Sequence, residues 1–105
     1  MSEWERITES AGALAKGDIA QFEIDVSGDG VYAFAASCGQ RCDVDMRLQR
    51  GVFEPGELVG LDISLSQVAF VDSIRSSQGR LRANVSMYAC EAPTCAFAFR
   101  VYRGN

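Results

Sequence analysis

The amino-acid sequence predicts one small all-β domain, an antiparallel β-sandwich or jelly roll of about seven to eight strands with two local disulfides. Apolar and polar residues alternate with the strand period of two, turn-forming residues recur about every ten residues, and the four cysteines form two close pairs. A chain of 105 residues has room for a single hydrophobic core. Residues 1–105 are therefore expected to form one domain.

The N-terminal stretch has two interpretations. Apolar residues between Trp4 and Leu14 recur at helical spacing, and Ser2 with Glu5 resembles a capping box, which is compatible with a short helix. Gly12 and the short length of the segment argue against that helix. We therefore favour an extended segment or edge strand.

Strand signals follow in the next third of the chain. Phe22–Val26 alternates apolar and acidic residues, and Ser27–Gly30 has the glycines and aspartate of a tight hairpin turn. Val31–Ser37 has almost no polar residue, which predicts a central strand covered on both faces. Asp43–Leu48 alternates again and should be half-buried.

The second half of the chain continues the pattern. Gly51–Gly56 is expected to be a loop, whereas Leu58–Leu65 and Val68–Ile74 are expected to be strands. Alternation in Arg80–Ala89 and Phe97–Val101 predicts that these two strands form a hairpin. The phenylalanines expected in the core are Phe22, Phe34, Phe97 and Phe99.

The cysteines fall where one predicted strand ends and the next begins. The natural pairing is within each loop, Cys38 with Cys42 and Cys90 with Cys95. A structural zinc site and free buried thiols are alternatives, although the spacing is wider than in common zinc knuckles. Each short-loop disulfide would stabilise the fold by only about 2 kcal/mol and would fix hairpin geometry. Disulfides also predict an oxidising compartment, secreted or periplasmic.

Export is not apparent from the first six residues, which lack the basic and apolar regions of a leader. We expect that Met1 replaces a removed leader, or that the domain was cut from a longer exported protein. No apolar run is long enough to span a bilayer, so membrane insertion is not expected. The sequence leaves the oligomeric state open.

Composition excludes several functions. The net charge is −4, and the basic residues are scattered without a run that could neutralise phosphates, which argues against nucleic-acid binding. The chain has no histidine, so the commonest general base and the serine and cysteine hydrolase arrangements are missing. Paired carboxylates such as Asp43 and Asp45 are conceivable catalysts, but a solvated strand face is the simpler interpretation. We expect a protein that is not an enzyme.

No cofactor motif is present, and calcium is the one ion the sequence suggests. Asp43 and Asp45 share a strand face, and backbone carbonyls of Ser27–Gly30 would add oxygen ligands, which calcium prefers. The predicted metal ligands are thus Asp43 and Asp45.

Five residues are candidates for ligand binding. Trp4, Tyr88 and Tyr102 lie outside the alternating apolar sets or near a chain end, where an exposed ring can serve recognition. Glu91 and Thr94 lie in the loop between Cys90 and Cys95, which a disulfide would hold rigid. Plain packing is the competing explanation for each ring.

The order of these features resembles the bacterial pre-peptidase C-terminal (PPC) domain. The resemblance spans about residues 12 to 102. The matching segments are Gly12–Asp18, Phe22, Gly30–Ala35, Cys38–Cys42, Asp43–Leu48, Val85–Cys90 and Cys95–Arg100. Members of this family are β-sandwich modules appended to exported proteins, and the resemblance implies a secretion, targeting or substrate-binding role without catalysis.

The sequence therefore predicts a non-catalytic secreted or periplasmic binding module whose partner is a protein or a polysaccharide. The alternative is a small inhibitor or effector that docks on a partner enzyme through disulfide-fixed hairpin loops.

Overall fold

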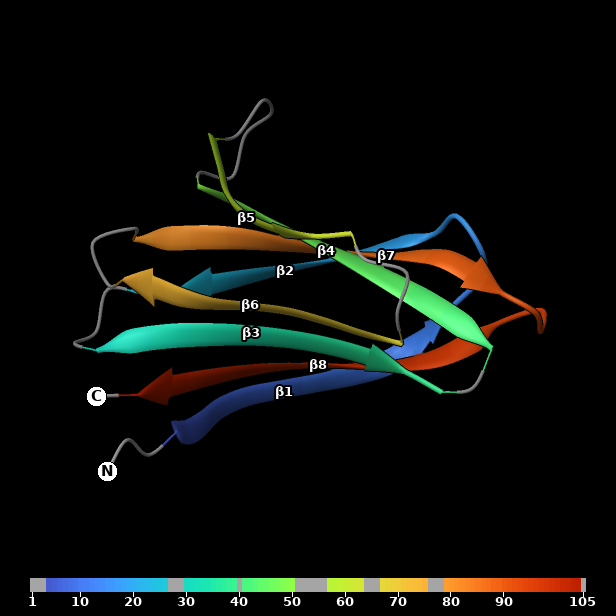
Figure 1. Ribbon diagram of the computed structural model, residues 1–105, viewed down its shortest axis with the longest axis horizontal. Coiled ribbons are helices and arrows are strands. Elements are labelled where there is room, and N and C mark those ends of the chain that lie inside the picture. Colours follow the sequence, from blue (N-terminus) through green and yellow to red (C-terminus); the bar gives the residue numbers. More distant parts are fainter. Residues whose placement is uncertain are drawn as a thin grey trace.

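The computed structural model describes residues 4–26, 30–39, 41–50, 57–63, 67–75 and 79–104, which contain eight strands. The strands are β1 (Trp4–Leu14), β2 (Ile19–Asp25), β3 (Val31–Cys38), β4 (Cys42–Arg50), β5 (Glu57–Asp62), β6 (Val68–Arg75), β7 (Arg80–Cys90) and β8 (Cys95–Gly104). The first sheet has the order β1-β8-β3-β6 and the second sheet the order β2-β7-β4-β5 (Figure 1). The all-β prediction is confirmed, and the N-terminal stretch is an edge strand.

The strands pair as nested antiparallel partners. β1 pairs with β8, β2 with β7, β3 with β6 and β4 with β5, from the ends of the chain inward. Further pairing of β3 with β8 and of β4 with β7 completes the two sheets. This nested pairing, divided between two packed sheets, is the topology of a jelly roll.

The predicted hairpin of β7 and β8 is wrong. The two strands follow each other in sequence, but β7 belongs to the second sheet and β8 to the first. The same holds for β2 and β3, on either side of the predicted turn Ser27–Gly30. Alternation predicts which side chains face the core, and the inward sets of β7 and β8 are indeed buried. It does not distinguish a return within one sheet from a crossing to the opposite one.

Aromatic rings join the two sheets in the core. Phe22 of β2 stacks on Phe99 of β8, with ring centroids 4.4 Å apart and planes 6° from parallel. Phe97 and Phe34 also contact this pair, each with a tilted ring whose centroid is 6.3 Å from its partner. Phe34, Phe97 and Phe99 are buried, and Phe22 is partly buried against the same cluster, so the predicted aromatic core is confirmed.

The prediction that β3 is covered on both faces needs correction. β3 lies between β8 and β6, and its inward side chains Tyr32, Phe34 and Ala36 are buried against the second sheet. No layer of described residues covers the other face. Of its outward residues, Ala33 is buried because the larger side chains of neighbouring strands surround it, whereas Ala35 is partly exposed.

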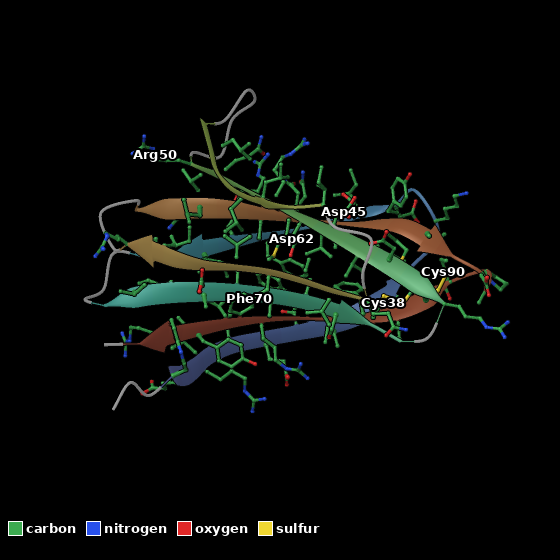
Figure 2. All side chains as sticks on the ribbon, viewed as in Figure 1. Cys38, Asp45, Arg50, Asp62, Phe70 and Cys90 are labelled. Carbon is green, nitrogen blue, oxygen red and sulfur yellow. A yellow bond between two sulfur atoms is a disulfide. The ribbon has the colours of Figure 1, made fainter. Side chains whose placement is uncertain are left out.

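The two disulfides lie together at one end of the sandwich (Figure 2). The bonds join Cys38 to Cys42 and Cys90 to Cys95, which confirms the predicted pairing over zinc ligation or free thiols. Each bond connects the end of a strand in one sheet to the start of a strand in the other. The disulfides therefore fix the corners between sheets, and not the turns of hairpins.

A further contact joins these two corners. The backbone nitrogen of Glu91 donates to the carbonyl of Arg41 at 3.3 Å, and the two side chains form an ion pair at 3.3 Å. Cys42 also lies directly opposite Cys90 in the pairing of β4 with β7. The disulfide end is thus one connected unit.

One long side of the sandwich is closed by β5 and β6, which belong to different sheets. Oδ2 of Asp62 accepts a hydrogen bond from the backbone nitrogen of Phe70 at 2.8 Å. Gly60 permits the close approach, because a Cβ there would lie 2.6 Å from the side chain of Val71. The edges of the two sheets therefore meet at this side.

Several predictions fall outside the described residues. These are the loop Gly51–Gly56, most of the turn Ser27–Gly30, and the end of the predicted strand at Leu65. Within the described ranges, no helix is long and apolar enough to cross a membrane.

Replacing Phe99 by alanine is expected to lower the free energy of unfolding by about 3 to 5 kcal/mol, because it removes a fully buried ring that contacts both sheets. Urea denaturation measures this change. The control is Phe70→Ala, whose ring is 48% exposed and should cost much less. Equal losses for the two variants would contradict the assigned core.

Serine replacement of one disulfide at a time, Cys38 with Cys42 or Cys90 with Cys95, should lower stability by about 2 kcal/mol each. Amide hydrogen exchange should increase at the disulfide end, near Asp43 and Ala96, and stay unchanged near Tyr32 and Arg103 at the opposite end. Uniformly faster exchange would show that the bonds do not act as local ties between the sheets.

Candidate functional site

The outer face of the second sheet has a polar row that crosses all four strands. Gln21 of β2 lies opposite Asn84 of β7, Asn84 opposite Arg47 of β4, and Arg47 opposite Leu61 of β5. These residues occupy the outward positions of strands whose alternate side chains fill the core. The row therefore places amides, a guanidinium group and an aliphatic side chain on one surface.

A second row lies beside the first. Ile19 lies opposite Ser86, and Ser86 opposite Asp45. Ile63 follows β5 at the other border of the sheet, and both isoleucines are more than half exposed. The small side chain of Ser86 extends less far from the sheet than the two isoleucines, so this row has a shallow centre between apolar borders.

The two rows form a groove with a volume of about 240 Å³. Its floor is polar, and its borders are aliphatic. The side chains from the outer face that line it are Ile19, Gln21, Asp45, Arg47, Gln49, Leu61, Ile63, Asn84 and Ser86. The groove crosses the strands, so its length is set by the spacing of four strands, about 14 Å from the first to the last.

Three amide side chains in the floor are connected by hydrogen bonds. Nε2 of Gln21 donates to Oδ1 of Asn84, and Nδ2 of Asn84 donates to Oε1 of Gln49, each at 2.9 Å. Each amide orients the next, so the chain fixes where donors and acceptors are presented. A ligand in the groove would meet a row of polar groups that is already ordered.

Asp45 is the carboxylate among the described groove residues, and its hydrogen bonding is incomplete. Its Oδ1 is buried and has no hydrogen-bond partner within the described part of the chain. Burial raises the pKa of Asp45 above the ordinary aspartate value, and the nearby charges of Asp43 and Asp62 raise it further. All three influences disfavour the charged carboxylate. Figure 2 labels Asp45 on β4 and Asp62 on the neighbouring strand.

The structure separates the five predicted binding residues into three places. Tyr88 is 59% exposed and lies on the outer face of β7, two residues beyond Ser86, on the same side of the sheet as the groove. Glu91 and Thr94 are exposed at the disulfide end, where Glu91 is paired with Arg41.

Trp4 and Tyr102 come together on the outer face of the first sheet. With Phe70 they surround Ala33 in a shallow apolar hollow of about 190 Å³. The indole of Trp4, 47% exposed, lies over Gly104, where a Cβ would approach the ring to 3.0 Å. Two of the predicted aromatic residues thus share one surface, and Phe70 is a third member that the sequence analysis did not single out.

On this first sheet, charged residues of β1 and β8 are paired, unlike Asp45. Glu9 of β1 accepts a hydrogen bond from Nε of Arg100 on β8 and forms an ion pair with Arg6 at 3.3 Å. The hydrogen bond from Arg100 lowers the pKa of Glu9 below its ordinary value, and the charge of Arg6 contributes. The pKa of Glu9 on the first sheet is therefore lowered, whereas the pKa of Asp45 on the second sheet is raised.

The predicted calcium site at Asp43 and Asp45 gains no further ligands from the described residues. Among them, no group of three or more aspartate, glutamate, cysteine or histidine side chains is placed to hold a metal. Gly30, the described residue among the predicted carbonyl ligands, directly precedes β3, whereas Asp43 is the second residue of β4, which follows β3 in the chain. Calcium binding stays a prediction.

Most groove residues were not identified from sequence. Outward positions are visible in the alternation, but the groove combines outward residues of β2, β4, β5 and β7, which are far apart in the chain. The sequence could have identified Phe70 as an outward-facing residue of β6, because it directly follows Ala69, whose side chain is buried. Asp45 was singled out, although for a metal.

No protein-family model matches the chain, and no curated protein shows significant sequence similarity to it. The jelly-roll fold and the groove geometry therefore carry the functional argument.

Replacing Asp45 by asparagine is expected to raise the melting temperature at neutral pH, because the amide removes a charge that burial, Asp43 and Asp62 all disfavour. The raised pKa means that the folded state binds this proton more tightly than the unfolded chain. The contribution of Asp45 to wild-type stability should therefore fall as pH rises from the ordinary aspartate pKa, about 4, through the raised value.

Melting curves from acidic to neutral pH test this expectation. The two proteins should melt at similar temperatures below the ordinary aspartate pKa and diverge above it. Glu23→Gln, which removes an exposed charge from the same sheet, is the control. A variant that is less stable than the wild type at neutral pH would contradict the assigned environment of Asp45.

Proposed function

We propose that this domain is a non-catalytic binding module, secreted or periplasmic, that holds a polysaccharide chain in the groove of the second sheet. The observation that carries the proposal is the ordered row of three amides between aliphatic borders. Binding sites commonly combine apolar walls with a few placed polar groups that orient the ligand. A groove whose polar groups are fixed before binding loses less conformational entropy when a ligand enters.

Polysaccharides suit this surface better than peptides do. A sugar hydroxyl both donates and accepts, so it can bond to either end of an amide, and the apolar faces of sugar rings can pack on Ile19 and Leu61. Tyr88, exposed on the same face, is available for stacking beyond the groove. An extended peptide usually binds by pairing with a sheet edge, whereas this groove crosses the strands on the sheet face.

The absence of catalysis is part of the proposal. The chain has no histidine, and Asp45 is the carboxylate among the described residues that line the groove. Hydrolysis of glycosidic bonds commonly uses two carboxyl groups that flank the bond. These features favour binding over cleavage.

An exported location agrees with the disulfides. Both bonds are consistent with an oxidising compartment, and their connection of the two sheets gives them a structural role there.

The second candidate function is docking on a partner enzyme through the disulfide end. Residues Glu91–Thr94 are exposed, and the adjoining disulfides and the contact with Arg41 restrain them. A restrained exposed loop suits an inhibitor. It would use a surface remote from the amide row.

Affinity electrophoresis through a panel of soluble polysaccharides tests the proposal, followed by calorimetry with the best ligand. Asn84→Ala removes both hydrogen bonds of the amide chain and should weaken binding about tenfold or more. Phe70→Ala, on the opposite sheet, is the matched control and should bind normally.

A wild-type domain that binds no polysaccharide of the panel would contradict the proposal. So would an Asn84→Ala variant with unchanged affinity. Loss of partner binding in Glu91→Ala with Thr94→Ala, together with unchanged binding in Asn84→Ala, would instead support docking through the disulfide end.

A further inference from the structure

The floor of the groove contains one polar atom that the fold leaves without a partner. Oδ1 of Asp45 is buried and receives no hydrogen bond from the described residues, whereas the neighbouring amides satisfy one another. Buried polar atoms without a partner are uncommon in native proteins because they lose hydration without compensation. The carboxylate of Asp45, which lines the groove, is therefore poorly compensated in the free domain, and a positive charge in the groove would stabilise it.

The charges around Asp45 indicate what kind of donor fits. Asp43 lies two residues before it on β4, and Asp62 lies on β5 with its Oδ2 accepting from Phe70. Both carboxylates add negative potential at Asp45. A cationic group beside the carboxylate of Asp45 would reduce this repulsion, whereas a neutral hydroxyl would not.

The groove residues beside Asp45 favour a ligand whose cationic group is part of a larger polar molecule. Arg47 is the next outward residue after Asp45, and the row continues to Asn84 and Gln21. Guanidinium and amide groups donate to hydroxyl and carbonyl oxygens. The groove thus offers an acceptor for a cation at Asp45 and donors for oxygen atoms beside it.

We propose that the polysaccharide bound in this groove carries free amino groups, and that one protonated amine forms an ion pair with the carboxylate of Asp45, which lines the groove. This inference rests on the proposed function and names the ligand class of the same site. An ammonium group has three donors and a full charge. An N-acetylated amine has one donor and no charge, and the carboxylate of an acidic sugar would be repelled by Asp45.

Calorimetry with three soluble oligosaccharides of equal length tests the inference across a pH series from mildly acidic to neutral, because the ion pair needs both a protonated sugar amine and an ionised Asp45. The probes are an oligomer of glucosamine, an oligomer of N-acetylglucosamine and an oligomer of glucose. The glucosamine oligomer should bind about tenfold more tightly than the other two. Added salt should reduce this preference, because part of it is electrostatic.

Asp45→Asn should remove the preference, so that the glucosamine and glucose oligomers bind with similar affinity. Glu23→Gln is the matched control, since it removes one negative charge from the same sheet outside the groove and should keep the preference. Circular dichroism and melting curves establish that both variants are folded.

The outcomes separate this inference from the proposed function. Equal binding of all three oligomers, weakened by Asn84→Ala, would overturn the role of the amine and leave the polysaccharide groove standing. Binding of none of them or of any other polysaccharide would overturn both. Tighter binding of a lysine-rich peptide than of the glucosamine oligomer, with the same loss in Asp45→Asn, would assign the amine to a protein partner and overturn the polysaccharide.

Discussion

The stacked rings of Phe22 and Phe99 join two sheets whose strands are nested from the chain ends inward. Because β3, β4, β6, β7 and β8 contribute buried side chains to this one core, and β2 packs Phe22 and Ile24 against it, the registers of these strands are coupled to the contact between the sheets. The disulfides close one end of the sandwich, and the bond from Phe70 to Asp62 closes one side. The inner faces are used for packing, and the proposed binding therefore uses an outer face.

The two outer faces have different chemistry, although both follow from the same alternation. The first sheet presents small and aromatic residues, including Ala33, Trp4 and Phe70, together with paired charges. The second sheet presents amides and a partly buried carboxylate. An apolar hollow can accept many partners, whereas an ordered polar row restricts both the position and the type of a ligand. The second sheet is therefore the more specific surface.

Much of the fold was predictable because strand periodicity and local cysteine spacing are short-range signals. The buried sets, the edge strand at the N-terminus and both disulfides agree with the structure. The crossing between β7 and β8 was not predictable, since a hairpin and a corner give the same alternation. The groove was missed for a related reason: Gln21, Asn84 and Arg47 become neighbours only through the pairing of β2, β7 and β4.

Asp45 and Glu9 differ in whether the surrounding residues stabilise the charged carboxylate. Glu9 is bonded to Arg100, so its charged form is stabilised in the free domain and requires no ligand. Asp45 is held among groups that destabilise its charge, and its buried oxygen has no partner in the described chain. Natural sequences tend to retain such local conflicts where function requires them. Since an amide at position 45 is expected to stabilise the sandwich, the carboxylate in this sequence is better explained by the proposed ligand than by the stability of the fold.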